Sequence, residues 1–302
     1  MTNNLVEFAS FEIIRHYRAA TGSDINSLYF NNVISILSYD LQAKGIKLRA
    51  PHCWYLSGDE VVRAAMPKQV RWQQAEEEVT KMWWEGGPPE TIREQERTII
   101  KGLAQAVVEE YAFQDDCRTI MVRAHVHAPF SFQREYLMLR WAIADMTDPS
   151  LKAKDDGALI LEKLNAAMDS FPREDFPELV PCIGPFRTVV TSLLETHELD
   201  HATVSAVADD FWRLFCQFLR PHGRAHDDVP NAIRGEWIRD LEWEPLVYLD
   251  LLSDQALAMV AHGLAPERTD LLAIAEKRRQ ELADLDRMID DFAARMREES
   301  DQ

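Results

Sequence analysis

Residues 28–62 read LYFNNVISILSYDLQAKGIKLRAPHCWYLSGDEVV, and the hydrophobic period of this stretch changes part-way along. The first half repeats apolar residues at helical spacing, and these are Leu28, Val33, Ile36, Leu37 and Leu41. We expect Asp24 to cap this helix and Gly45 to end it. The second half alternates at Ile46 and Leu48 and then reaches the turn-forming residues 57–59. A short β-element is therefore predicted directly after the helix.

The segments on either side extend this prediction to a module. Residues 5–20 repeat apolar side chains at three-residue steps before Gly22, which predicts another helix. Two helices and a small β-wing indicate a winged-helix-like module over residues 1–85. The charged segment 73–84 is expected to be helical, and the Gly-Gly-Pro-Pro run at 86–89 predicts a domain boundary.

The rest of the chain, residues 90–302, is predicted to be one helical domain. Its helices are expected at 90–112, 132–146, 186–198, 201–219, 232–241 and 243–262, while 117–126 is interpreted as either a strand or a helix end. Residues 171–185 are rich in proline and are expected to form an ordered connection. The predicted fold class is therefore mainly α, a helical protein in two parts.

A long amphipathic helix is expected at the C-terminal end, over residues 267–299. Apolar residues there recur at steps of mostly three and four and form a seam, whose candidate partner-binding residues are Leu282, Leu285, Ile289 and Phe292. Such a helix either packs on its own protein or pairs with another chain, so this seam is a candidate surface for self-association or for a protein partner.

Composition limits the classes of function. With 46% hydrophobic and 28% charged residues, the 302-residue chain has the balance of a globular protein. Its net charge of −18 opposes binding to nucleic acids and anionic lipids, except through a local basic patch. The sequence has neither a signal-peptide pattern nor a long apolar run, so a cytoplasmic protein without a membrane association is expected. The four cysteines lie far apart, which argues against a zinc ribbon and against disulfides.

One stretch, residues 44–72, carries a basic charge that opposes the average of the chain. Its candidate partner-binding residues combine cations with aromatic rings, and they are Lys47, Arg49, Trp54, Tyr55, Arg63, Lys68 and Arg71. This set fits an acidic protein surface or a nucleic-acid strand. An equally good interpretation is that these cations dock on the acidic remainder of the same chain.

The motif HELDH at residues 197–201 matches H-E-x-x-H, the pattern of helical zinc proteases. In that interpretation His197 and His201 bind zinc and Glu198 is the general base, with a third ligand from Asp209, His222, His226 or Glu236. However, Asp200 is also a good N-cap for the following helix, which would place the motif across a turn. We favour the interpretation that residues 197–201 form a turn between two helices and that the protein has no cofactor. A zinc site at these residues is the alternative.

Two further groups of histidines have spacings that could suit a metal ion. His125 and His127 would share one face of a strand, and residues 221–228, PHGRAHDD, form a polar loop with two histidines and two aspartates. We interpret the first pair as structural and the second group as an ordinary loop.

Residues 28–62 also resemble the core of the Panacea or SocA-like antitoxin domains. The resemblance rests on an aromatic pair in the helix and on a W-Y-x-x-G-x-x-V element, and its residues are Leu28, Tyr29, Phe30, Trp54, Tyr55, Gly58 and Val61. The family's usual Gly-Pro is Gly58-Asp59 here. The resemblance implies a non-catalytic module that recognises a partner protein in a prokaryotic toxin–antitoxin or antiphage locus.

Three functional hypotheses follow. The first is a non-enzymatic interaction protein of a prokaryotic multi-protein system, because the sequence has no Gly-rich phosphate loop and no nucleophile elbow. The alternatives are a zinc-dependent hydrolase that uses residues 197–201 and a winged-helix regulator that contacts DNA through residues 44–72.

Overall fold

The computed structural model describes residues 4–74, 80–89, 92–114, 117–147, 157–195, 201–239, 241 and 243–261, together with residues 273, 276, 277, 280 and 287. Within these residues the protein is mainly α-helical, as predicted. The chain forms two compact units, of which unit 1 comprises residues 1–134 and 216–239, and unit 2 comprises residues 135–215 and 240–302. None of the described helices is both long enough and apolar enough to span a bilayer.

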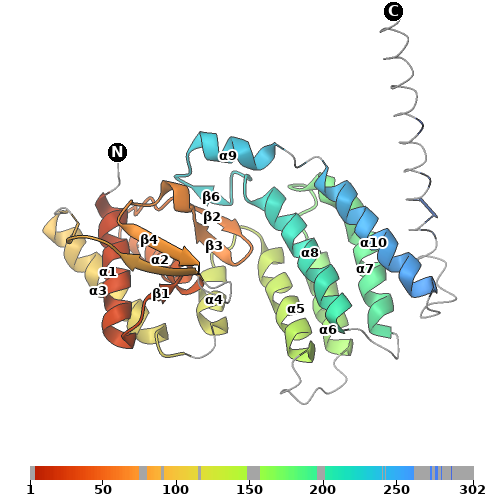
Figure 1. Cartoon of the computed structure of the whole chain (residues 1–302), viewed down its shortest axis with the longest axis horizontal. Helices are drawn as coiled ribbons and strands as arrows, with labels where there is room; N and C mark the ends of the chain where they lie inside the picture. Colours follow the sequence, from red (N-terminus) through yellow and green to blue (C-terminus); the bar gives the residue numbers. More distant parts are fainter. Residues whose placement is uncertain are drawn as a thin grey trace, which may run out of the picture. The chain divides into compact units, whose positions relative to one another are not determined.

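Four helices form the framework of unit 1 (Figure 1): α1 (Asn4–Thr21), α2 (Ser27–Gln42), α3 (Glu94–Tyr111) and α4 (Arg118–His125). Helix α3 packs on α1 and α2, and α4 packs on α2. Their contact builds an apolar core to which Ile13, Phe30, Leu37 and Ile100 contribute fully buried side chains. The predicted cap of α2 was two residues too early, because Asn26 rather than Asp24 accepts a hydrogen bond from the backbone N–H of Tyr29.

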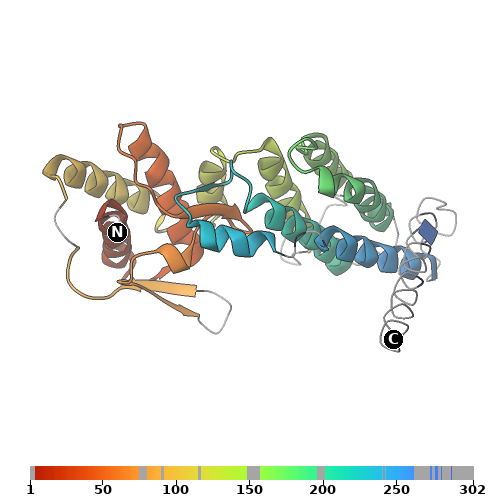
Figure 2. The ribbon, with the colours of Figure 1, turned by 90° about the horizontal axis from the view of Figure 1, so that it is seen from above.

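The first sheet of unit 1 replaces a predicted helix. Strands β4 (Val70–Gln74) and β5 (Thr80–Trp84) are antiparallel, and the short strand β1 (Ile25–Asn26) pairs with the other edge of β5. Residues 73, 74 and 80–84, which were predicted to be helical, therefore lie in strands. Alternate residues of β4 and β5 face the core, with Val70 and Met82 buried, and Trp84 of β5 packs edge-on against Phe11 of α1. Figure 2 shows this hairpin alongside α1.

The second sheet confirms the predicted β-element after α2. Strands β2 (His52–Tyr55) and β3 (Gly58–Val61) form a tight hairpin. A third strand, β6 (His226–Asp227), pairs with the other edge of β2, so that His52 lies opposite Asp227 and Cys53 lies opposite His226. The short 3₁₀ helix η1 (Arg63–Ala65) follows the hairpin, and α9 (Asn231–Ile238) follows β6. A segment from far along the chain thereby completes the sheet.

Gly58 is required at the turn of the β2–β3 hairpin. Its φ of +113° lies in a region that residues with a side chain rarely adopt. A Cβ atom at this position would also lie 2.9 Å from Cε1 of His125. Both backbone conformation and space therefore favour glycine here.

Unit 2 is built from helices (Figure 1): α5 (Ser131–Thr147), α6 (Gly157–Asp169), α7 (Val180–Glu195), α8 (His201–Leu219) and α10 (Glu244–Ala261), with a 3₁₀ turn η2 (Pro177–Leu179). The division between the two units falls inside α5 and α8. Aromatic side chains fill the core: Phe186 of α7 stacks on Phe211 of α8 with ring centroids 4.4 Å apart, and Tyr136 stacks on Trp212. The hydroxyl of Tyr136 donates to the carbonyl of Ala208 over 2.7 Å, which satisfies this buried polar group.

The structure differs from the predictions at three places in the chain. Residues 118–125 are helical, so the strand alternative for 117–126 is wrong. The connection at 171–185 is shorter than predicted, because α7 begins at Val180 and contains Pro185. The domains predicted at 1–85 and 90–302 differ from the two compact units, since α3 and α4 belong with the N-terminal helices. The predicted helix at 267–299, including Leu282, Leu285, Ile289 and Phe292, lies almost entirely outside the described residues.

Candidate functional site

The two aromatic residues of the predicted basic surface are part of the protein's own packing. Trp54 is only 2% exposed and meets the ring of His125 edge-on. Tyr55 lies under the guanidinium of Arg220, 4.6 Å from the ring centroid, and the same guanidinium lies 4.7 Å from the ring of Trp237. This sandwich of a cation between two rings attaches the segment before β6 to the hairpin.

Three of the five predicted cations are also engaged within unit 1. Lys47 forms an ion pair with Asp227 over 3.2 Å, and Arg71 pairs with Glu85. Arg63 lies over the ring of Trp72 and donates a hydrogen bond to Thr80. These contacts agree with the interpretation that the basic residues dock on acidic and aromatic parts of the same chain.

The remaining two cations, Arg49 and Lys68, have exposed side chains. Of the seven predicted residues, the structure brings Lys47, Arg49 and Trp54 together at one pocket. Tyr55, Arg63, Lys68 and Arg71 do not line that pocket.

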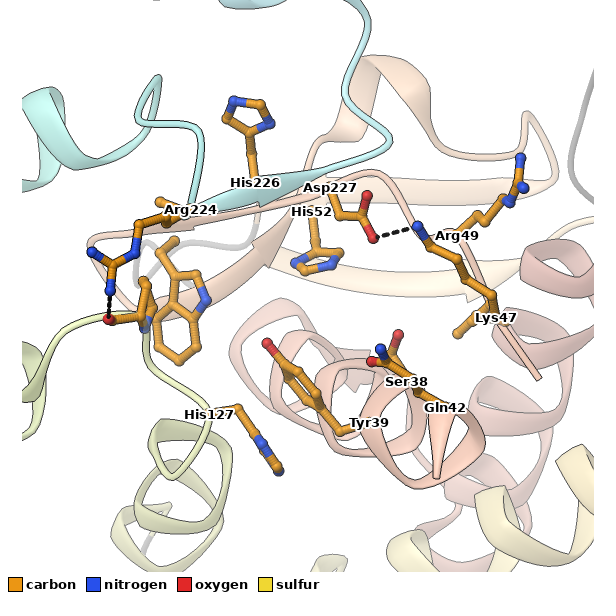
Figure 3. A pocket seen from close by; sticks show the side chains of 14 residues that line it. Ser38, Tyr39, Gln42, Lys47, Arg49, His52, His127, Arg224, His226 and Asp227 are labelled. Carbon is orange, nitrogen blue, oxygen red and sulfur yellow. Dashed lines mark hydrogen bonds and ion pairs between the residues drawn. The ribbon is translucent and has the colours of Figure 1, made fainter. Parts of the chain in front are cut away.

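This pocket, with a volume of about 260 Å³, is built from four segments of unit 1. We call it the His52 pocket, after the histidine that Figure 3 shows pointing from β2 toward Tyr39 of α2. Helix α2, the segment 47–54, the residues after α4 and the segment 224–227 all contribute. Its lining residues are Ser38, Tyr39, Gln42, Lys47, Leu48, Arg49, His52, Trp54, His127, Pro129, Arg224, Ala225, His226 and Asp227.

A buried carboxylate positions the ring of His52. Oδ1 of Asp59 lies 2.5 Å from Nδ1 of His52, and Oδ2 accepts a hydrogen bond from the hydroxyl of Ser35 over 2.7 Å. Asp59 lies opposite Trp54 in the hairpin, so His52 is its diagonal neighbour on the same face of the sheet. Since Asp59 is 4% exposed, these two hydrogen bonds stabilise a carboxylate that is largely removed from water.

The same contacts set the charge of His52. Desolvation lowers the pKa of His52, but the charge of Asp59 and its hydrogen bond, together with Asp227 and Asp228, outweigh this effect. The net result is a raised pKa. Because Nδ1–H donates to Asp59, the opposite nitrogen, Nε2, is the ring atom available to a ligand.

Tyr39, His127 and His125 lie near His52 but differ from it in the direction of their pKa shifts or in their hydrogen bonds. The rings of Tyr39 and His127 stack with their centroids 3.8 Å apart. Burial raises the pKa of Tyr39, which keeps its hydroxyl protonated, whereas desolvation lowers the pKa of His127. His125 is buried, and its Nδ1–H donates to the carbonyl of Met121 over 2.8 Å, which agrees with the structural role inferred for it.

The proposed zinc site cannot be assembled from the described residues. Residues 197–200 lie outside them, and the side chain of His201 at the start of α8 is not described either. Of the suggested third ligands, Asp209 is ion-paired with Arg140 over 2.9 Å. In the described part of the chain there is no group of three or more His, Cys, Asp or Glu side chains suited to a metal ion.

A second surface, on unit 2, was not predicted from the sequence. We call it the α10 surface and define it by its exposed apolar side chains: Trp243 (59% exposed), Leu246 (41%), Val247 (62%) and Leu257 (51%). The opposite side of the same helix is buried, through Tyr248, Leu252, Ala256 and Met259. The sequence of α10 did contain a signal for this surface. A helix that is apolar on both sides has more apolar residues than burial of one face requires.

The His52 pocket was also missed, although Trp54, Lys47 and Arg49 were singled out. The signal was a histidine and an aspartate seven residues apart, with His52 before the predicted turn at 57–59 and Asp59 as its last residue. No family model matches the chain, and no curated protein or solved structure matches it either.

Proposed function

We propose that the protein is a non-enzymatic interaction protein that binds a protein partner, or a second copy of itself, through the α10 surface and the segment that follows it. The observation that carries this proposal is the set of exposed apolar side chains at α10. Single exposed apolar residues are common on monomers, but three exposed aliphatic side chains on one helix, with a tryptophan directly before it, are typical of an interface.

The charge of this surface defines the partner further. Asp254, exposed in the middle of α10, lies between the apolar residues Val247 and Leu257 along the helix. A partner that covers the surface would therefore combine apolar side chains with a basic residue. The apolar seam predicted for residues 267–299 extends the same kind of surface beyond α10, and a continuous helix there is part of this proposal.

The resemblance of residues 28–62 to antitoxin domains supports a place in a prokaryotic toxin–antitoxin or antiphage system. A winged-helix-like arrangement of residues 1–85 is part of the same proposal, supported by a helix followed by a β-hairpin. DNA binding through residues 44–72 has less support, because Lys47, Arg63 and Arg71 are engaged within the chain.

Native mass spectrometry of the gently purified full chain tests the proposal. We expect a metal-free dimer or a stoichiometric complex with one identified protein, and we expect the Trp243→Ser, Val247→Ser double variant to lose it. Leu159→Ser is the matched control, because it removes an exposed apolar side chain of unit 2 elsewhere, on α6. A monomer without any partner would contradict the proposal, and one zinc per chain that is lost in His197→Ala would favour the hydrolase.

A further inference from the structure

The α10 surface is apolar at both ends and acidic in the middle. Trp243 and Val247 lie at one end, and Leu257 lies at the other. The carbonyl of Trp243 accepts a hydrogen bond from the backbone N–H of Val247 over 3.1 Å, so Trp243 continues the helical spacing. Asp250 and Asp254 lie on the same face between the two ends, because they precede Leu257 by seven and three residues. A helix that covers this surface should be apolar at both ends and positively charged in the middle.

A later segment of the same chain has this pattern. Helix α10 ends at Ala261, and residues 271–285 follow it after a short connection. Apolar side chains recur in this segment at steps of three and four when Arg278 is counted with them, and they are Leu271, Ala275, Leu282 and Leu285. Arg278 is the middle member of the series, so the segment carries its positive charge where the α10 surface is acidic.

The apolar residues of the two series match when the segments run antiparallel. From Trp243 to Leu257 the chain advances by fourteen residues, about 21 Å at the rise of an α-helix, and Leu271 to Leu285 covers the same distance. The pairs that fall level are Trp243 with Leu285, Leu246 with Leu282, and Leu257 with Leu271. Apolar residues therefore meet at both ends of the contact.

The charged residues match in the same register. Arg278 falls level with Asp250 and lies one helical turn from the level of Asp254, within reach of a long arginine side chain. In this direction Asp254 is level with the small Ala275, whereas in the parallel direction it would face Leu282. The position of Asp254 thus favours the antiparallel direction, because burying a carboxylate against leucine is costly.

Within one chain the α10 surface is uncovered. A hairpin of α10 and the following segment would cover the residues next to the connection first, yet Leu257 is 51% exposed. Five residues of the C-terminal segment are described as helical and exposed, and they are Ala273, Glu276, Lys277, Gln280 and Arg287. None of these five belongs to the series that matches α10. The α10 surface is therefore open to a segment from another molecule.

We propose that the α10 surface of one copy binds residues 271–285 of a second copy in the antiparallel direction. This inference rests on the proposed function and names the partner of the same surface. Exchange of identical segments is reciprocal in a dimer with twofold symmetry, so every contact forms twice. The ion pair between Asp250 and Arg278 sets the register, and the apolar pairs supply the buried area.

Sedimentation equilibrium of the full chain tests the charged contact. We expect Arg278→Glu to weaken dimerisation about tenfold or more, because a carboxylate would then face Asp250 and Asp254. Combining Asp250→Arg with Arg278→Glu should recover most of the affinity. Lys277→Glu is the charge-matched control, since Lys277 is exposed and adjacent to Arg278 but lies outside the series, and it should dimerise as the wild type does.

Cysteine cross-linking tests the direction of the pairing and the exchange between copies. Leu257→Cys and Leu271→Cys are placed in separate chains that also carry Cys117→Ser, because Cys117 is exposed. Oxidation of the mixture should give a disulfide-linked dimer that neither chain gives alone. Leu257→Cys mixed with Leu285→Cys should give no linked dimer, because these positions are level only in the parallel direction.

Four outcomes would overturn this inference. They are the absence of a dimer, equal dimerisation of Arg278→Glu and Lys277→Glu, a link between positions 257 and 285, and a link between 257 and 271 that forms only within a single chain carrying both cysteines. The proposed function fails separately. An association that Trp243→Ser with Val247→Ser abolishes but Arg278→Glu leaves intact would keep the α10 surface as an interface and exclude residues 271–285 as its occupant. Circular dichroism of each variant establishes that a loss of association does not come from unfolding.

Discussion

His52 and Asp59 lie diagonally across the β2–β3 hairpin, with Nδ1 of the histidine 2.5 Å from Oδ1 of the aspartate. Neither residue is adjacent to the other in sequence, and the hydroxyl that completes the arrangement belongs to Ser35 on α2. The hairpin and the helix are thus joined by a polar contact that is buried within an otherwise apolar region. This contact determines how unit 1 should respond to pH and to substitution.

The pH dependence of stability should report on His52. Its pKa is raised in the folded protein, chiefly by Asp59 and also by Asp227 and Asp228, which together outweigh desolvation. The stabilisation from its protonation is therefore fully present below the unfolded value of 6.5, and it is lost as the pH rises through the folded pKa. We expect the free energy of unfolding of the wild type to fall toward that of His52→Gln as the pH increases.

Urea denaturation of both proteins from pH 5.5 to pH 9 measures this difference. Using the difference between the two proteins removes the contributions of His125 and His127, whose pKa values are lowered and which destabilise the fold at low pH. A difference that is constant or that grows with pH would contradict the assignment.

Ser35→Ala should destabilise unit 1. The variant removes a buried hydrogen bond to a carboxylate, a change that costs about 1.5–3 kcal/mol. Ser38→Ala is the control, because Ser38 lies on the same helix and is only partly buried at the pocket. Chemical denaturation at pH 7 gives both values, and equal losses would show that the contact between Ser35 and Asp59 contributes little.

Gly58→Ala should cost more stability than Gly45→Ala. Both glycines have a positive φ, and forcing a side chain into the left-handed region at Gly45 costs about 1–2 kcal/mol. At Gly58 the new methyl group would in addition press on the ring of His125, whereas at Gly45 no atom lies within 4 Å of the added Cβ. Thermal melting of the two variants compares the costs, and a smaller loss at Gly58 would indicate that the hairpin turn can rearrange.

The aromatic core of unit 2 should show pairwise coupling. Phe186 and Phe211 stack with an angle of 4° between their planes, so a double-mutant cycle of the two Phe→Leu variants should give about 0.5–1.5 kcal/mol of coupling energy. The pair Phe186→Leu and Leu159→Ser serves as the control, because Leu159 is exposed, and its effects should be additive within about 0.5 kcal/mol. Additive effects in both pairs would argue against a specific stacking contribution.

The elements with strong local signals were predictable. Helices α1, α2, α8 and α10 follow from apolar residues at helical spacing, and the β2–β3 hairpin follows from the turn at 57–59. The error at residues 73–84 has a physical reason. Charged residues suggested a helix, but Trp72, Trp83 and Trp84 belong to a residue type that favours strands, and packing against α1 and α2 decided the outcome.

The composition and periodicity of the sequence determined that the protein is mainly helical, because burial of an amphipathic stripe depends only on the spacing of apolar residues along the chain. The sites depended on contacts between distant segments. Asp59 reaches His52 across a turn, Ser35 reaches Asp59 from another helix, and β6 brings Asp227 to Lys47 from almost two hundred residues away in the chain. The charge, orientation and pKa of a side chain depend on such contacts, so only the tertiary structure decided where the His52 pocket forms and which residues line it.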